Sequence, residues 1–229
     1  MTRWILALAL ITPVEPGPVD GLVEAPGLAG WTRIGGEVGN WRSEEGEIVC
    51  RGQGKDWLAW NRDHADFVVA LEYRLHPGGN SGLLLRAPRR GDPSRDGLEI
   101  QLLDDDAPVY RQLQPWQYTG SVYGVIAARR GASKKAGDWN RLTVKAEGSR
   151  ITVTLNGQTV VDDDLARHPE ARPRHPGIDR SRGAIGLQSH GEPVRFRNLT
   201  IRELPRRHED GGSPRSVGPP GRAGHPAGR

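Results

Sequence analysis

The sequence predicts an all-β protein, a two-sheet antiparallel sandwich. Three observations support this class: short runs of alternating apolar and polar residues recur from about residue 41 to residue 204, helical spacing is almost absent, and Gly, Pro and Asp separate the runs. Each alternating run buries one face, so the strands pair into sheets that pack together. No linker interrupts the runs within the 229 residues, and sandwiches of this length fold as one domain.

The expected strands follow one another with turn residues between them. The clearest is residues 67–75, in which every second residue is apolar. Residues 141–147 and 150–156 alternate equally well, and Asn156 with Gly157 forms a strong hairpin signal before the next strand. The remaining expected strands are 47–50, 57–60, 81–86, 97–103, 158–162, 183–189 and 194–204.

Two longer loops interrupt this pattern, at about residues 104–137 and 164–183. The first carries Trp116, Tyr118 and Tyr123 among polar residues, which argues against disorder, and the second is rich in Arg, His and Pro. Long loops in compact domains are usually functional or disordered. We therefore expect both loops to form walls of a site.

The two ends of the chain differ from the middle. Residues 1–20 combine Arg3 with a short apolar run and then prolines, which is typical of an export signal and too short to span a bilayer. We expect an exported protein, periplasmic or extracellular, without a transmembrane segment; a ragged N-terminus or a first strand is the alternative. Residues 205–229 are rich in Gly, Pro and Arg and are expected to be disordered.

The basic character of the chain lies mainly in that C-terminal segment. The sequence pI is about 9.6, but five Arg against Glu209 and Asp210 place +3 of the net +4 there and leave the middle nearly neutral. This distribution argues against nucleic acid as a partner. Cys50 is the only cysteine, so no intrachain disulfide forms, and its apolar run predicts a buried side chain.

Three alternating runs place polar side chains on one expected face. In GLEIQLLDDD, residues 97–106, the apolar residues share one side of the strand and leave Glu99 and Gln101 on the other. The runs NSGLLLR, residues 80–86, and AIGLQSHG, residues 184–191, alternate in the same way, and Gly82 and Gly186 are expected to keep the polar face open. If the three strands share one sheet, its outer face carries Asn80, Arg86, Glu99, Gln101, Gln188 and His190.

A concave polar sheet edged by aromatic loops is the usual design of sugar-binding sandwiches, because planar polar groups meet hydroxyls and aromatic rings meet the apolar face of the sugar. The alternative is a solvated outer face on which Glu99 pairs with Arg86. The run Asp104 to Asp106 reads as a strand-terminating turn, and a calcium site is the weaker interpretation.

Six ordered segments resemble the 3-keto-disaccharide hydrolase family over about residues 28–204. They are WRSEEGEIVCRG, DFVVALEYRLHPGGNSGLLLRAP, GDPSRDGLEIQLLDDD, LQPWQYTGSVYGV, GDWNRLTVKAEGSRITVTLNG and GAIGLQSHGEPVRFRNLTIREL. The resemblance implies a concanavalin-like jelly roll that acts on glycosides already oxidised at C3. A C3 ketone acidifies the C2 proton, so a base forms an enediolate and the C1 aglycone leaves by β-elimination before water adds.

The resemblance also suggests roles for the expected site residues. Glu99 is the leading candidate for the base, and His190 is the alternative base or the acid. Arg86, Gln101 and Gln188 would hold the carbonyl and the developing oxyanion, a task that a divalent metal could share. The expected substrate-binding residues are Asn80, Gln101, Asp104, Trp116, Tyr123 and Gln188.

Other functions use the same residues. A noncatalytic carbohydrate-binding module of the cell envelope needs the aromatic and amide groups but neither acid nor base, and a structural sandwich domain needs none of them. A conventional glycosidase needs a second carboxylate facing Glu99, for which Asp104 and Asp106 are candidates. The oxidised substrate implies an upstream sugar 3-dehydrogenase.

Overall fold

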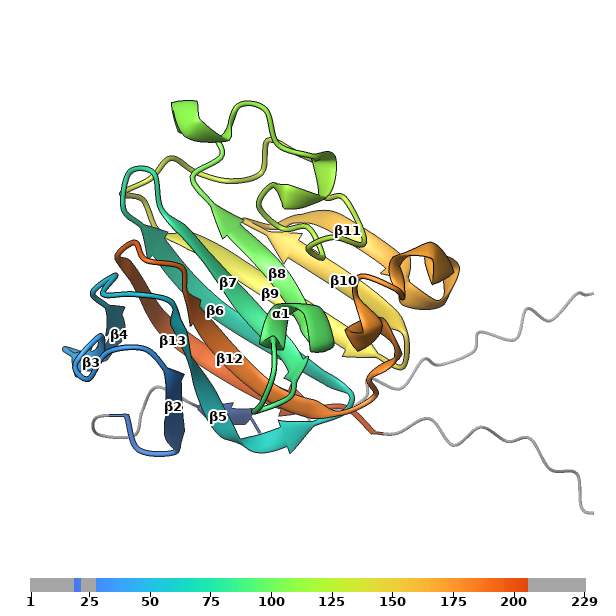
Figure 1. The fold of residues 1–229 in the computed structure, drawn as a ribbon, viewed down its shortest axis with the longest axis horizontal. Coiled ribbons are helices and arrows are strands. Elements are labelled where there is room, and N and C mark those ends of the chain that lie inside the picture. The colour runs from blue at the N-terminus through green and yellow to red at the C-terminus, as the bar shows by residue number, and fades with distance from the viewer. Residues whose placement is uncertain (1–18, 22–27, 206–229) are drawn as a thin grey trace, which may run out of the picture.

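Two antiparallel sheets pack face to face in the computed structural model, which describes residues 19–21 and 28–205 (Figure 1). The larger sheet contains, in spatial order, β11 (Gln158–Asp164), β10 (Arg150–Leu155), β9 (Asn140–Glu147), β6 (Phe67–Leu75), β13 (Val194–Glu203), β4 (Glu47–Cys50) and β3 (Trp41–Glu44), with β1 (Val19–Gly21) also paired to β13. The smaller sheet contains β2 (Trp31–Gly35), β5 (Asp56–His64), β12 (Gly183–Ser189), β7 (Asn80–Ala87) and β8 (Leu98–Leu103).

The core lies between the sheets. Alternate residues of β6, from Phe67 to Leu75, are buried in it, as their period-two pattern predicts. The strands β7 and β8 instead bury nearly every residue. Their outer faces are therefore covered as well, in part by a second apolar cluster made of Trp57, Ala59, Leu84, Ala87 and Ala184.

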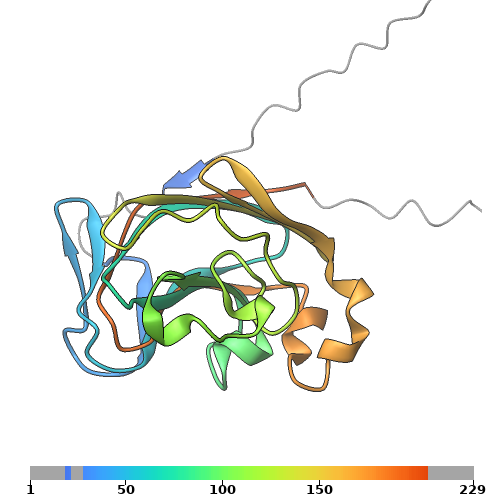
Figure 2. The same ribbon diagram turned by 90° about the horizontal axis from the view of Figure 1, so that it is seen from above.

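A single helical turn, α1 (Pro93–Asp96), covers part of that outer face. Figures 1 and 2 show it on the side of the smaller sheet that faces away from the larger one. The Asp92 side chain accepts hydrogen bonds from the backbone N–H groups of Ser94 and Arg95, at 3.0 and 3.2 Å, and Pro93 occupies the first turn. An N-cap followed by proline is a strong helix start, so this short sequence fixes α1 beside β8.

Short 3₁₀ turns form the two long loops. The first loop contains η1 (Pro108–Tyr110) and η2 (Pro115–Gln117), and the second contains η3 (Leu165–Arg167), η4 (Pro169–Ala171) and η5 (Pro176–Asp179). The first loop also pairs with the open edge of β8, where the backbone N–H of Gln101 donates to the Ser121 carbonyl at 3.0 Å. The loop thereby protects an edge strand that would otherwise be exposed.

The fold class predicted from the sequence is confirmed, and the hairpin at Asn156 and Gly157 has the positive φ angles that such a turn requires. Cys50 is buried, as expected. Within the described residues, no helix is long and apolar enough to cross a bilayer. The expected export signal lies outside these residues except for Val19 and Asp20 in β1, and the expected tail lies outside them beyond Pro205.

Candidate functional site

The three strands that carry the expected polar residues are neighbours in the smaller sheet. The registers align Gln188 of β12, Gly82 of β7 and Gln101 of β8 in one row across the sheet. Asn80 begins β7, two residues before Gly82, and His190 directly follows β12, two residues after Gln188. Five of the six residues expected on this face therefore share it: Asn80, Glu99, Gln101, Gln188 and His190.

Glu99 leans across Gly82 toward β12. A Cβ on residue 82 would lie 2.4 Å from Glu99 Oε1, so only glycine leaves room for this carboxyl group. Its side chain hydrogen-bonds Ser94 of α1 and Gln188, and it is only 5% exposed. Burial raises the pKa of Glu99 to about 7 because a desolvated carboxylate is unfavourable, and the charge of Asp92 adds to the effect.

The expectation that two glycines keep the face open is wrong. The space above Gly82 holds the Glu99 carboxyl group, and the space above Gly186 holds the Trp57 ring, whose Cε3 would lie 2.4 Å from a Cβ there. The glycines let the neighbouring side chains lie flat on the sheet. The face is consequently packed above these two glycines, and a cavity lies beside the packed side chains.

That cavity, of about 300 Å³, lies between residues 91–94 and the strands β5 and β12. Its lining includes Lys55, Trp57, Ser94, Gln188 and His190. Glu99 is not among the lining residues, so its carboxyl group lies behind Ser94 and Gln188, the two side chains that it contacts. The cavity presents an aromatic ring, an amide, a hydroxyl, an imidazole and an ammonium group to one small ligand.

His190 and Lys55 both line the cavity. Burial and the nearby Lys55 ammonium lower the pKa of His190, while Glu192, 3.8 Å away, acts in the opposite direction. The imidazole is therefore neutral at pH 7. Lys55 is a site residue that the sequence analysis missed. It lies just before β5 and two residues before Trp57, so alternation along this segment places both side chains on the same side.

Asn80 and Gln101 form a pair beside this cavity. The Gln101 amide donates to Asn80 Oδ1 at 2.8 Å. The Tyr110 side chain also hydrogen-bonds Asn80, and its hydroxyl donates to the Gly78 carbonyl at 3.1 Å. The first long loop thus holds one margin of the polar face.

Tyr123 and Trp116 lie along the β8 edge. The Tyr123 backbone N–H donates to the Glu99 carbonyl at 2.9 Å, and its ring meets those of Trp116 and His175 edge to face, with centroids 5.4 and 6.3 Å apart. His175 belongs to the second long loop, so both loops border the strand that carries Glu99. The sequence analysis did not place His175 beside this strand.

Arg86 is the exception, and its expected place beside Glu99 is wrong. A β-bulge shifts the pairing of β7 with β12 at this point, and Arg86 has a φ of 49°. The bulge reverses the alternation, so its side chain donates to the carbonyls of Ala65 and Gly148, at 2.9 and 2.8 Å, and pairs with Asp66 at 3.3 Å. Arg86 is 2% exposed and ties together loops at one end of the sandwich.

Asp104 lies at the same margin of the polar face as Tyr110 and stabilises a turn. Its Oδ2 accepts the backbone N–H of Gly78 at 2.8 Å, which supports the turn interpretation of the acidic run. Throughout the described part of the chain, no three His, Cys, Asp or Glu side chains are grouped so as to hold a metal ion.

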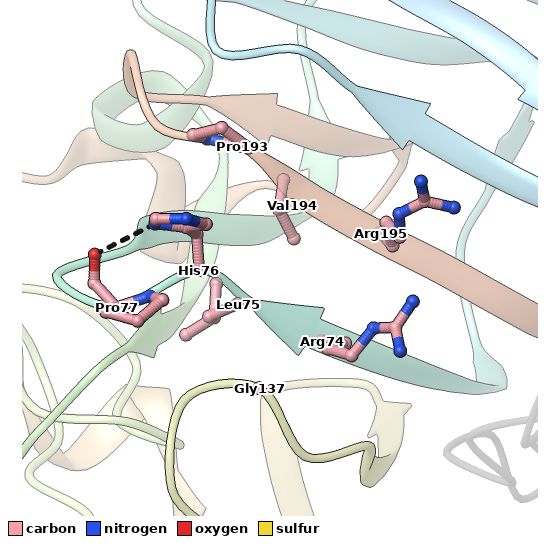
Figure 3. Close-up of a pocket in the computed structure, with 8 residues that line it drawn as sticks. All are labelled: Arg74, Leu75, His76, Pro77, Gly137, Pro193, Val194 and Arg195. Atoms are coloured by element: carbon pink, nitrogen blue, oxygen red, sulfur yellow. Dashed lines mark hydrogen bonds between the residues drawn. The ribbon is translucent and has the colours of Figure 1, made fainter.

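A second cavity of about 300 Å³ lies in the larger sheet, where β6 ends and β13 begins (Figure 3). The guanidinium groups of Arg74 and Arg195 lie side by side there, on directly paired residues. Arg195 binds Glu47 at 2.7 Å, and Arg74 lies over the Trp139 ring at 4.7 Å. Because both groups are engaged within the protein, the cavity beside His190 is the better candidate site.

Comparison with known families and proteins gives a consistent result. Residues 21–202 match the model of the 3-keto-alpha-glucoside-1,2-lyase-like domain. A curated 3-keto-disaccharide hydrolase of Bacteroides thetaiotaomicron is 23% identical over 238 aligned positions, which cover 86% of this chain and 82% of that protein.

Solved structures share the fold. The chain is similar to a Parabacteroides distasonis protein with the name "Putative glycosyl hydrolase", with a TM-score of 0.72, 25% identity, and coverage of 82% of this chain and all of that one. It is also similar to the carbohydrate binding module CBM66 from Bacillus subtilis, with a TM-score of 0.54, 16% identity, and coverage of 76% of this chain and 96% of that module. At 16% identity the second likeness concerns the fold alone.

Proposed function

Because this chain belongs to the 3-keto-alpha-glucoside-1,2-lyase-like family, we propose that it cleaves glycosides whose sugar carries a ketone at C3. The cavity beside His190 binds the oxidised ring in this proposal. The observation that carries it is the meeting of a neutral imidazole, an ammonium group and an amide at one cavity, with a carboxyl group of raised pKa behind them. These are the groups that C2 proton abstraction requires.

The reaction begins with transfer of the C2 proton to His190. The C–H electrons form the C2–C3 double bond, and the carbonyl oxygen becomes an oxyanion. When the C3 carbonyl reforms, a C1–C2 double bond forms and the C1–O bond to the aglycone breaks. The leaving oxygen then takes a proton. The proton on His190 exchanges with solvent, water adds to C1, and His190 protonates C2. The sum is hydrolysis without an oxocarbenium ion.

The pKa directions support His190 as the base and Glu99 as the acid. A base must be unprotonated before it reacts, and the lowered pKa of His190 keeps it so at pH 7. An acid must hold its proton, and a carboxyl group with a pKa of about 7 does so for half of the molecules at that pH. The sequence-based expectation ranked Glu99 first as the base; burial favours the reverse assignment.

Lys55 takes the place that the sequence reasoning gave to Arg86. Its ammonium group is the cation at the cavity, whereas Arg86 is engaged elsewhere. We assign Lys55 and Gln188 to the developing C3 oxyanion, where fixed donors stabilise charge. Trp57 lines the cavity and offers an apolar surface to the sugar ring, and Asn80 with Gln101 extends the polar face for hydroxyl groups.

Two further expectations accompany this proposal. The substrate must already be oxidised, so a sugar 3-dehydrogenase acts before this protein. Such an enzyme and its product would be found in the same compartment, which for an exported protein is the periplasm or the extracellular space.

The test compares a 3-keto-disaccharide with its unoxidised parent. Purified protein is incubated with each, and the released sugar is followed by mass spectrometry. The expected result is release of the 3-keto sugar from the oxidised substrate alone. Binding of both sugars without product would support a noncatalytic binding module instead, and cleavage of the parent would contradict the mechanism.

A further inference from the structure

The position of Glu99 leaves its proton without a direct path to the cavity. Glu99 is 5% exposed as a whole residue and is not among the residues that line the cavity. An acid that protonates a leaving group must reach it within hydrogen-bond distance or through an intervening group. Two side chains contact Glu99 and line the cavity, Ser94 and Gln188. Of these two, Ser94 carries the hydroxyl group, which can both accept and donate a proton.

The Ser94 hydroxyl is suited to pass a proton. A hydroxyl group has one donor and two acceptor positions. Its Oγ accepts the Gln188 amide N–H at 3.1 Å, which leaves one acceptor position and the hydroxyl proton available. With Glu99 protonated, the carboxyl O–H donates to Ser94 Oγ, and the Ser94 O–H is free to point into the cavity.

The backbone holds Ser94 firmly in this place. Its N–H donates to Asp92 Oδ1 at 3.0 Å, within α1. The C-terminal end of α1 is packed closely as well, because a Cβ on Gly97 would lie 2.7 Å from both Ala87 Cα and the Pro93 carbonyl oxygen. The hydroxyl is consequently positioned before a substrate binds, which lowers the cost of ordering it.

We propose that Ser94 passes a proton from Glu99 to the leaving-group oxygen. This inference rests on the proposed function. As the C1–O bond breaks, its electron pair takes the Ser94 proton, and Ser94 takes the Glu99 proton, so the aglycone leaves as an alcohol and Glu99 becomes a carboxylate. When water adds to C1, the same two groups move a proton in the opposite direction and Glu99 is restored.

Two substrates separate this role from a structural one. A 3-keto-disaccharide has a poor leaving group that needs a proton, whereas a nitrophenyl 3-keto-glucoside releases an anion that does not. Ser94→Ala is expected to lower kcat for the disaccharide by about 10²-fold and to change kcat for the nitrophenyl substrate only slightly. Ser94→Thr retains the hydroxyl and should restore most of the disaccharide activity.

Arg95→Ala is the matched control, since Arg95 is exposed on the same helical turn; it should leave both rates unchanged. Equal losses on both substrates in Ser94→Ala, or full activity on the disaccharide, would overturn the relay.

A measurement that needs no turnover distinguishes failure of the Ser94 relay from failure of the proposed function. The hydrogen bond from Ser94 lowers the pKa of Glu99, so Ser94→Ala should raise that pKa, as followed by carbon NMR of the labelled carboxyl group. An unchanged pKa would mean that Ser94 does not donate to Glu99 and would overturn the relay. Inactive wild-type protein with the pKa shift present would instead overturn the proposed function.

Discussion

At the scale of single residues, the site depends on two groups whose pKa values are shifted by burial in useful directions. Burial lowers the pKa of His190 and raises that of Glu99. If Glu99 were the base and His190 the acid, kcat/KM would show the same bell-shaped dependence on pH. In either assignment the active enzyme carries one proton on this pair of groups. Variants combined with different leaving groups are therefore needed to assign the roles.

Glu99→Gln and His190→Gln should differ in their dependence on the leaving group. If Glu99 is the acid, Glu99→Gln loses about 10²-fold or more on a 3-keto-disaccharide but retains activity on a nitrophenyl 3-keto-glucoside. His190→Gln should lose activity on both, since each needs the C2 proton removed. Initial rates of aglycone release measure this. Retained nitrophenyl activity in His190→Gln, with none in Glu99→Gln, would reverse the assignment.

At the scale of secondary-structure elements, strand alternation placed most of the site correctly. It brought Glu99, Gln101 and Gln188 to one face because their strands are regular there. It failed at Arg86, where an extra residue in β7 reverses the phase, and no local sequence signal marks that bulge. Lys55 was missed because the alternation of polar residues was followed along the strands of Asn80, Glu99 and Gln188 and not along β5. The cavity could not be predicted because residues of α1 form one of its walls.

Replacement of Arg86 tests this correction. Arg86→Met removes the donors to two backbone carbonyls and leaves Asp66 without its guanidinium partner. Loss of one partner of a buried pair costs about 3–5 kcal/mol, so the midpoint of urea unfolding should fall markedly. Under conditions where the variant is folded, kcat should stay near the wild-type value. A stable variant with greatly reduced kcat would return Arg86 to the active site.

At the scale of the whole molecule, the sandwich was predictable because it follows from alternation over many strands, and errors at single positions do not change it. The packing of side chains over Gly82 and Gly186 was not predictable, since it depends on which strands become neighbours. Burial of Glu99 in that packed layer also affects the stability of the entire domain.

The free energy of unfolding should fall as the pH rises. The pKa of Glu99 is about 7 in the folded protein against an ordinary 4.5, so between these values the folded state binds more protons than the unfolded chain. At 1.36 kcal/mol per pKa unit, the loss amounts to about 3 kcal/mol. Glu99→Gln removes this contribution, so its stability relative to wild type should increase between pH 5 and pH 8 in urea titrations. A constant difference would contradict the raised pKa.

Proton exchange at C2 distinguishes the proposed elimination from conventional hydrolysis, because only elimination removes the C2 proton. The protein is incubated in D₂O with a 3-keto-disaccharide and, separately, with its unoxidised parent, and both are followed by proton NMR. The released 3-keto sugar is expected to carry deuterium at C2, and the parent is expected to be neither exchanged nor cleaved. Release of a product that retains its original C2 proton, or cleavage of the parent, would contradict it.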